Sequence, residues 1–333
     1  MSFEPRFSLA SSRLSETRTD LWKVHSDALQ RQAQGDDIIM MSVGDPDLRT
    51  IVRIIEHAVT SLYRGRTHYS PGMGELHLRQ TIADIETRAS GRLTSSDEII
   101  IFPGATNAIF SVLTCLLDSD DELIVTEPAY VGYQGIFQAI GANIISVPAN
   151  VDNGFTLDSD AIERVISSKT KVLLLNTPGN PAGNMIPADQ LASLARLCLE
   201  KNIWLVCDEV YSMITFEQKH ISARTAAKNL ENIIVIDGLS KSHAMTGWRL
   251  GWAVAPVNVV EKLLNFTSAT IFGCSQFIQD AAAFAMQNDG DYIQSITAKY
   301  KARRDYACER IRQINGLRCN KPQAGMFLMV DVS

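Results

Sequence analysis

The sequence has no apolar run long enough to span a membrane and no cluster of Lys or Arg residues. Its formal net charge is −6, which argues against nucleic-acid binding. The first residues lack a basic segment followed by an apolar one, so we expect no signal peptide. The six cysteines are scattered without a C-x-x-C pair, as is typical of reduced thiols. We therefore expect a cytoplasmic protein that binds neither nucleic acid nor membrane.

The composition is that of a globular chain with a sizeable core. Of the 333 residues, 46% are hydrophobic and 20% are charged, which suits one large domain or two modest ones. From about residue 99, short apolar runs alternate with helical segments, and this rhythm predicts an α/β fold with a mainly parallel, doubly wound sheet. The seven predicted strands are residues 99–102, 123–126, 144–147, 172–176, 204–208, 233–237 and 250–255.

Polar or aromatic groups follow five of these runs. Sheets of this kind bind ligands at the carboxyl ends of their strands, so these groups are expected to share one edge. The residues after the first run open a helix whose free amides suit a phosphate. In chain order, the groups are the Gly104-Ala105-Thr106 turn, Tyr130, Asn180, the Asp208 carboxylate with Tyr211, and Lys241.

Residues 238–251 contain a lysine in a turn of small residues after a buried strand. Small neighbours allow another molecule to approach the backbone closely. Lys241 in a dry pocket loses pKa and becomes an amine able to form a Schiff base with a carbonyl. Arg249, eight positions on, supplies a fixed fork suited to phosphate. An aldehyde cofactor that carries a phosphate, such as pyridoxal phosphate (PLP), needs both groups.

This stretch resembles the lysine signature of the class I/II aminotransferases, which are PLP enzymes of fold type I. Residues 240–249 (SKSHAMTGWR), 42–47 (SVGDPD) and 277–280 (FIQD) are similar to the arginine–pyruvate transaminase subgroup in particular. The resemblance implies a three-layer α/β sheet domain with a smaller α+β domain, and PLP as cofactor without a metal. One departure is Gly238, where many relatives carry serine, so that a phosphate hydrogen bond is absent or comes from Ser240.

The resemblance also implies roles for individual residues. Lys241 would hold PLP and move a proton, Asp208 would pair with the ring nitrogen, and Tyr211 would lower the pKa of the cofactor linkage. Gly44 and Asn180 would contact substrate, and Tyr69 would reach the phosphate in the neighbouring subunit of a homodimer. The implied cofactor-binding residues are Ala105, Thr106, Tyr130, Asn180, Asp208, Tyr211, Ser240, Lys241, Arg249 and Tyr69. His243 is interpreted as a packed histidine without a chemical role.

The domain organisation is also taken from the resemblance. We expect a large PLP-binding domain over residues 48–270 and a small domain from residues 1–47 and 271–333. Residues 38–43 and 323–330 are predicted as strands, and the segments between residues 256 and 314 as helices. Family members continue beyond this point and carry an arginine that clamps the substrate carboxylate. No residue before Ser333 matches it, so we expect the C-terminal part to be incomplete.

Several functions remain open from the sequence. The resemblance favours L-arginine as amino donor and pyruvate as acceptor, in arginine catabolism. Aspartate, aromatic amino acids and methionine are alternative donors. A PLP-dependent lyase would use the same Lys241, Asp208 and Arg249. A PLP-binding protein impaired by an incomplete C-terminal part is the non-enzymatic alternative.

Overall fold

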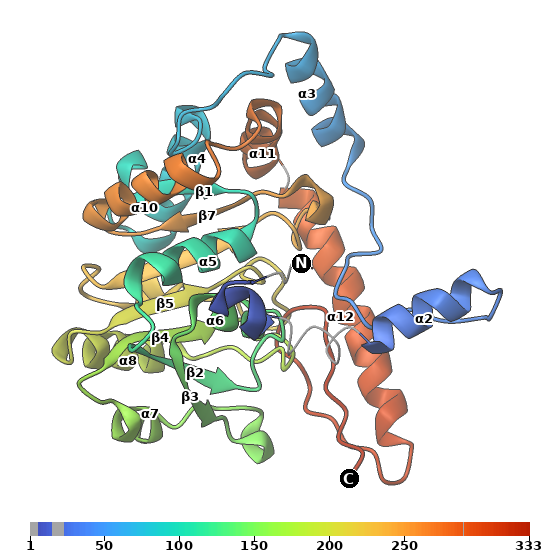
Figure 1. Ribbon diagram of the computed structural model, residues 1–333. Coiled ribbons are helices and arrows are strands. Elements are labelled where there is room, and N and C mark those ends of the chain that lie inside the picture. Colours follow the sequence, from blue (N-terminus) through green and yellow to red (C-terminus); the bar gives the residue numbers. More distant parts are fainter. Residues whose placement is uncertain (1–5, 15–22, 289) are drawn as a thin grey trace, which may run out of the picture.

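The computed structural model describes residues 6–14, 23–288 and 290–333. Its centre is a seven-stranded sheet with the order β1-β7-β6-β5-β4-β2-β3 (Figure 1). All seven predicted strands are confirmed, with ends that differ by two residues at most. Their bounds are Ile99–Phe102 (β1), Glu122–Glu127 (β2), Asn143–Pro148 (β3), Thr170–Asn176 (β4), Trp204–Asp208 (β5), Ile233–Gly238 (β6) and Gly251–Val254 (β7).

The sheet is mainly parallel, as expected, with one strand reversed. β7 pairs antiparallel with both β1 and β6, while the pairs β2–β3, β2–β4, β4–β5 and β5–β6 are parallel. No crossover helix separates β6 from β7, so the chain turns back directly beside β6 and must run antiparallel to it. The connecting loop contains Lys241.

Helices cover both faces of the sheet, and this explains why the central strands read as continuous apolar runs (Figure 1). One core unites Phe102 and Val206 with residues of α5, α6 and α10, and a second unites Leu205 with residues of α7 and α8. A third joins β1 and β7 to α3, α4 and α11. The helices are α2 (Lys23–Ala33), α3 (Val52–Tyr63), α4 (Leu76–Ser90), α5 (Ala105–Leu116), α6 (Tyr133–Ile140), α7 (Ser159–Val165), α8 (Ala188–Glu200), α9 (Ala223–Ala226), α10 (Val257–Thr270), α11 (Gln276–Asn288) and α12 (Gly290–Arg312).

Two predicted strands are wrong. Residues 38–43 have no regular structure, and the side chains of Ile39 and Met41 are 83% and 87% exposed. Residues 323–330 form one isolated bridge, between Ala324 and Thr215. A strand needs a neighbouring backbone for its hydrogen bonds, and an apolar pattern alone does not supply one. Residues 1–5 and 15–22 of the predicted small domain lie outside the described residues.

The topology brings the carboxyl ends of the strands to one edge. Asn176 pairs with Asp208, and Asp208 pairs with Ile236, so the ends of β4, β5 and β6 are level. α12 lies beyond this edge, where Ile296 and Tyr300 pack against Ile214 (Figure 1). No helix among the described residues is long and apolar enough to cross a membrane.

Candidate active site

The turn between the end of β1 and the first turn of α5, here called the cradle, lies beside the guanidinium of Arg249. A Cβ built on Gly104 would lie 2.6 Å from Nη2 of Arg249, and one built on Gly251 would lie 2.5 Å from the amide nitrogen of Ala105. Only glycine therefore lets the guanidinium and the helix amides come this close. The first amides of α5, including those of Ala105 and Thr106, belong to the positive end of a 12-residue helix. Helix amides and a guanidinium together suit a phosphate.

Lys241 lies at the same edge, shortly after the end of β6. Its Nζ donates a hydrogen bond to the carbonyl oxygen of Gly44 at 2.6 Å, so the N-terminal segment reaches the amine. Burial lowers the pKa of the Lys241 ammonium from its ordinary value. The Asp45 carboxylate raises that pKa and the Arg249 guanidinium lowers it. Burial is the largest of these effects, and it favours the neutral, reactive form of the amine.

Asp208 ends β5 and is 3% exposed. Burial raises the pKa of its carboxyl group to about 6, although a hydrogen bond from Tyr133 opposes this. The Tyr133 hydroxyl donates to Oδ2 at 2.5 Å, and the backbone amide of Val210 donates to Oδ1 at 3.2 Å. A buried carboxylate of this kind is well suited to a cationic partner, because such a partner replaces the lost hydration.

Sequence reasoning missed Tyr133. It is the first residue of α6 and is fully buried, and its ring packs edge-on against that of Tyr130 at 5.3 Å. The available signal was the Tyr130-Val131-Gly132-Tyr133 spacing after β2, in which the second tyrosine follows the first by nearly one helical turn. That spacing indicates neighbouring side chains. It does not reveal the hydrogen bond to Asp208, which comes from a different strand.

Asn180 and Tyr211 lie next to each other at this edge. The Asn180 side-chain amide donates to the Tyr211 hydroxyl at 3.5 Å, while the Asn180 backbone amide donates to Oδ1 of Asn176 at 2.7 Å. Burial raises the pKa of Tyr211 well above its ordinary value, and Asp208 adds to this. The phenol is therefore neutral and able to donate a hydrogen bond.

Phe327 was also missed. Its ring packs edge-on against that of Tyr211 at 5.5 Å, and a Cβ built on Gly44 would lie 2.6 Å from it. Through Phe327, the C-terminal segment thus packs against both Tyr211 and the loop at Gly44, whose carbonyl accepts the hydrogen bond from Lys241. The apolar run 323–330 was the signal, but it indicated a strand and not a wall of the site.

The remaining predicted residues differ in position. Ser240 precedes Lys241 in the β6–β7 loop, and Gly238 pairs with Gly251 across that loop. His243 is buried, and burial lowers its pKa to about 4, in keeping with a packed, neutral histidine. Tyr69 is not part of this site: it is 81% exposed and packs against Phe272.

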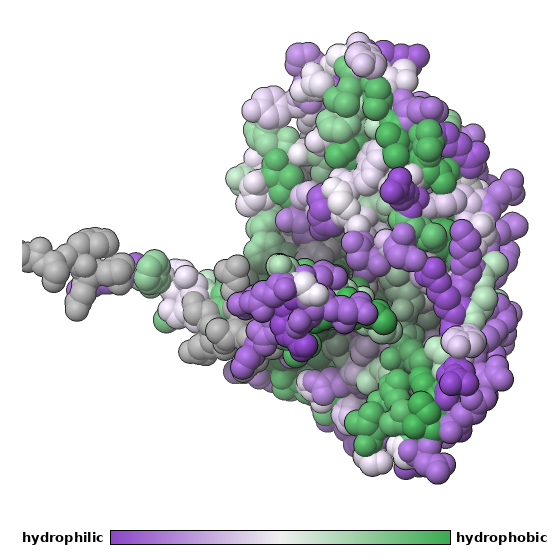
Figure 2. All heavy atoms as spheres, turned by 90° about the vertical axis from the view of Figure 1, so that its right-hand side faces the viewer, coloured by the Kyte–Doolittle hydropathy of each residue, from purple (hydrophilic) through white to green (hydrophobic). Residues whose placement is uncertain are grey.

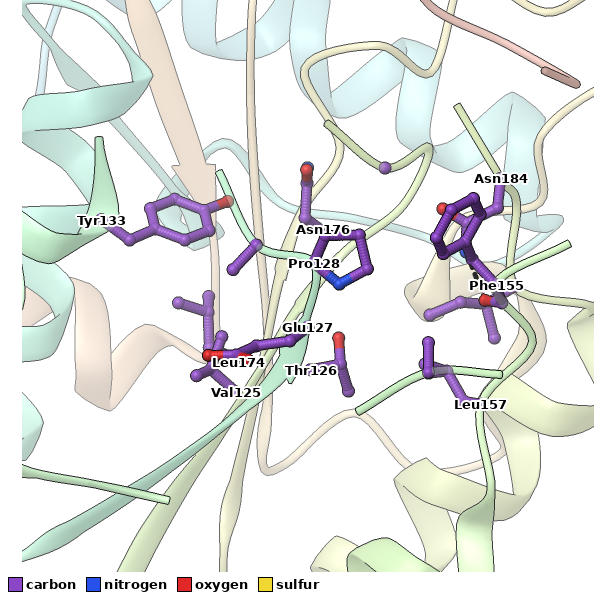
Figure 3. Close-up of a pocket in the computed structure, with 14 residues that line it drawn as sticks. Val125, Thr126, Glu127, Pro128, Tyr133, Phe155, Leu157, Leu174, Asn176 and Asn184 are labelled. Atoms are coloured by element: carbon purple, nitrogen blue, oxygen red, sulfur yellow. Dashed lines mark hydrogen bonds between the residues drawn. The ribbon is translucent and has the colours of Figure 1, made fainter. Parts of the chain in front are cut away.

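A small pocket borders the site between the ends of β2 and β4 (Figure 3). Tyr133 and Asn176 lie on one side of it, and Phe155 and Asn184 lie on the other, where Asn184 donates to the Phe155 carbonyl at 2.9 Å.

The residues present fit PLP. A phosphate suits the glycine cradle beside Arg249, an aldehyde suits the amine of Lys241, and a ring nitrogen suits the buried carboxylate of Asp208. The amine, carboxylate and cradle follow strands β6, β5 and β1, which lie within one sheet. A neutral molecule without an anionic group would leave the cradle unused.

Comparisons with known proteins agree with this geometry. The family described as "Aminotransferase class I and II" matches residues 36–333. Arginine–pyruvate transaminase AruH of Pseudomonas aeruginosa is 37% identical over 98% of this chain and 83% of its own length. Aspartate/prephenate aminotransferase of Thermus thermophilus is 31% identical over 93% of this chain and 80% of its own.

Solved structures show the same likeness. A double mutant of Thermus thermophilus aspartate aminotransferase superposes with a TM-score of 0.92 at 28% identity, and the match covers 98% of this chain and 85% of that one. An alanine aminotransferase from Pyrococcus furiosus also gives a TM-score of 0.92, at 26% identity, over 98% and 84% of the two chains. With its sheet of fold type I and a site that fits PLP, the chain belongs to the class I and II aminotransferases and is a PLP-dependent enzyme that transfers amino groups.

Proposed function

We propose that this enzyme moves the amino group of L-arginine to pyruvate, in the breakdown of arginine in the cytoplasm. The relative named for this reaction is 37% identical over nearly the whole chain. The single structural observation that supports a cationic donor is Asp45. Its carboxylate accepts from Thr246 at 2.7 Å, and among charged groups it affects the Lys241 pKa most. A negative charge beside the amine favours substrates that carry a second positive charge.

The chemistry assigns three tasks to residues of this chain. Bound PLP supplies an aldehyde that holds an amino group and a ring that withdraws electrons from the substrate Cα. Lys241, as a neutral amine, would take the proton from the substrate Cα and deliver it to the cofactor carbon that came from the aldehyde. Asp208 would keep the ring nitrogen protonated, because its buried negative charge favours a cationic partner. The carbonyl of Gly44 holds the Lys241 amine in place between transfers.

The other site residues bind and orient. The cradle at Ala105 and Thr106, together with Arg249 and Ser240, would hold the phosphate. Tyr130 would pack against the ring, and Asn180 and Tyr211 would each donate a hydrogen bond to the ring oxygen. Asn180 and Gly44 also contact the substrate. These assignments are supported by the convergence of the groups on one edge of the sheet.

We further propose a homodimer with shared sites, in which Tyr69 serves the neighbouring subunit. Tyr69 reaches outward from its own chain, and the adjacent helix α3 exposes Val52, Ile55, Val59 and Leu62. Hydrophobic side chains gather in the upper part of the molecular face shown in Figure 2, where α3 lies. A contiguous apolar surface of this kind is typical of a protein interface.

The large PLP-binding domain is assigned to residues 48–270, and the small domain to residues 1–47 and 271–333.

The test is a matrix of donors and acceptors. L-Arginine, L-aspartate, L-phenylalanine and L-methionine are each paired with pyruvate and with 2-oxoglutarate, and both products are quantified. We expect the highest kcat/KM for L-arginine with pyruvate, and no transaminase activity for the Lys241→Ala variant. A preference for L-aspartate would refute the proposed donor and leave transamination intact. Release of a Cβ substituent without formation of a new amino acid would indicate a lyase.

A loss of charge at Asp45 then tests the structural argument. Asp45→Asn removes the negative charge and keeps the Thr246 hydrogen bond available. We expect a higher KM for L-arginine with little change for L-methionine, which carries no second charge. Equal effects on both donors would show that Asp45 does not select the substrate.

A further inference from the structure

The backbone that carries Tyr69 is fastened by helix α11. Gln279 is fully buried, and its amide group donates to Oγ of Ser70 at 3.0 Å and accepts from the backbone amide of Glu75 at 2.7 Å. The next residue, Asp280, receives two hydrogen bonds of 2.8 Å from Arg66. Residues on both sides of Tyr69 are therefore fixed, and the rotation of its side chain is the remaining freedom.

The side chain of Tyr69 meets the ring of Phe272. The two ring centroids are 4.7 Å apart with an angle of 69°, an edge-to-face arrangement. Both residues are largely exposed, at 81% and 59%, so neither side chain gains much from burial in the core. The contact favours one direction for the Tyr69 phenol over the others.

Phe272 holds this position in a strained conformation. Its φ is +60°, a left-handed value that is a genuine outlier for a bulky residue. Its backbone is nevertheless fixed: its amide donates to the Thr267 carbonyl at 2.9 Å, and a Cβ on the following Gly273 would lie 2.9 Å from the Ser70 carbonyl oxygen. Glycine would adopt the same φ without cost. The strain therefore indicates that the ring of Phe272 has a role at this position, and the ring contact that it makes is with Tyr69.

We propose that Phe272 is a positioning residue that directs the Tyr69 hydroxyl towards the cofactor phosphate of the second copy of this chain. This rests on the proposed role of Tyr69. The strain at Phe272 is offset by a contact that orders Tyr69 before the cofactor binds. Preorganisation of this kind raises affinity without adding a contact to the ligand.

The test is a double-mutant cycle read out as the dissociation constant of PLP. The purified dimeric protein, depleted of cofactor, is titrated with PLP as the wild type, as Tyr69→Phe, as Phe272→Gly and as the double variant. An aromatic pair contributes enough to predict a two- to tenfold weaker affinity, roughly, for Phe272→Gly. In the Tyr69→Phe background the same change should have no effect, because no hydroxyl remains to be directed.

Matched variants separate positioning from backbone effects. Phe272→Leu keeps the backbone restricted but lacks the ring, so it should weaken PLP binding as glycine does, and Phe272→Tyr should restore it. Asn202→Gly relieves a positive φ of 57° elsewhere and should leave PLP affinity unchanged. The thermal midpoint of Phe272→Gly should not fall, since strain is removed.

Three outcomes would overturn the inference. The first is that Phe272→Gly weakens PLP binding equally with and without the Tyr69 hydroxyl. The second is that Phe272→Gly leaves PLP binding unchanged although Tyr69→Phe weakens it. The third is unchanged affinity in Tyr69→Phe, which would remove the task assigned to both residues. Under each of these outcomes, PLP attachment at Lys241 and the transfer of amino groups remain intact. The proposed function itself would be refuted if the wild-type protein lacked that attachment and that activity.

Discussion

Removing the Tyr133 hydroxyl tests the electrostatics at Asp208 most directly. Tyr133→Phe deletes one oxygen from a fully buried side chain and leaves the Val210 amide as a donor to the carboxylate. A hydrogen bond to a charged group contributes about 1.5–3 kcal/mol, which corresponds to a pKa change of about 1–2. The pKa of Asp208 should therefore rise from about 6 towards roughly 7–8.

The sign of the stability effect follows from linkage. The folded-state pKa of Asp208 lies above its ordinary value, so the stability gained from protonation is fully present below about pH 4 and lost as the pH rises through about 6. For a pKa of 6, the loss between pH 5 and pH 8 is about 1.4 kcal/mol; for a pKa of 7–8 it is about 2.6–3.6 kcal/mol. Between pH 5 and pH 8, the free energy of unfolding of the variant should therefore fall by about 1–2 kcal/mol more than that of the wild type.

The assay is urea unfolding of cofactor-free protein at several pH values from 5 to 8. Tyr306→Phe, an exposed tyrosine on α12, is the control for the loss of a hydroxyl. Other titrating groups cancel in the difference between variant and wild type. Parallel pH profiles for Tyr133→Phe and the wild type would refute the reasoning, as would a shallower profile for the variant.

Three further predictions concern the cofactor site. Lys241→Ala should lose the borohydride-reducible attachment of PLP, as checked by peptide mass spectrometry, and labelling of a different lysine would exclude Lys241. Asp208→Asn should retain PLP yet lose most turnover, because an amide cannot hold the ring-nitrogen proton, and a near-native kcat would contradict this. Gly251→Ala should weaken PLP binding at least tenfold, since its Cβ would lie 2.5 Å from the Ala105 nitrogen, whereas Gly247→Ala, with nothing within 4 Å, should not.

The dimer can be tested by complementation. Provided that Tyr69→Phe and Lys241→Ala chains are each inactive alone, they should recover some activity when mixed, if one subunit supplies Tyr69 to the other. Subunit exchange is verified with differently tagged chains. Mixtures that exchange yet stay inactive would show that each site is built from one chain.

Much of the sheet was predictable because burial on both faces forces an apolar run on each central strand. β5 is an example, since its residues 204–208 were predicted with the observed bounds. The placement of Asp208 and Lys241 at one edge followed from the parallel direction of their strands. The identity of the chemical groups also came from the sequence, because small residues around a single lysine indicate close approach by a ligand.

The tertiary structure decided what depends on partners distant in the chain. Residues 38–43 and 323–330 have strand-like patterns, yet among the described residues their only strand-type pairing is the isolated bridge between Ala324 and Thr215. Phe327 instead packs on Gly44 and Tyr211. The hydrogen bond from Tyr133 to Asp208 joins residues 75 positions apart, and the cradle joins Gly104 to Arg249. Local sequence sets which groups a segment carries, but hydrogen bonds and close contacts form only where folding brings two such segments together.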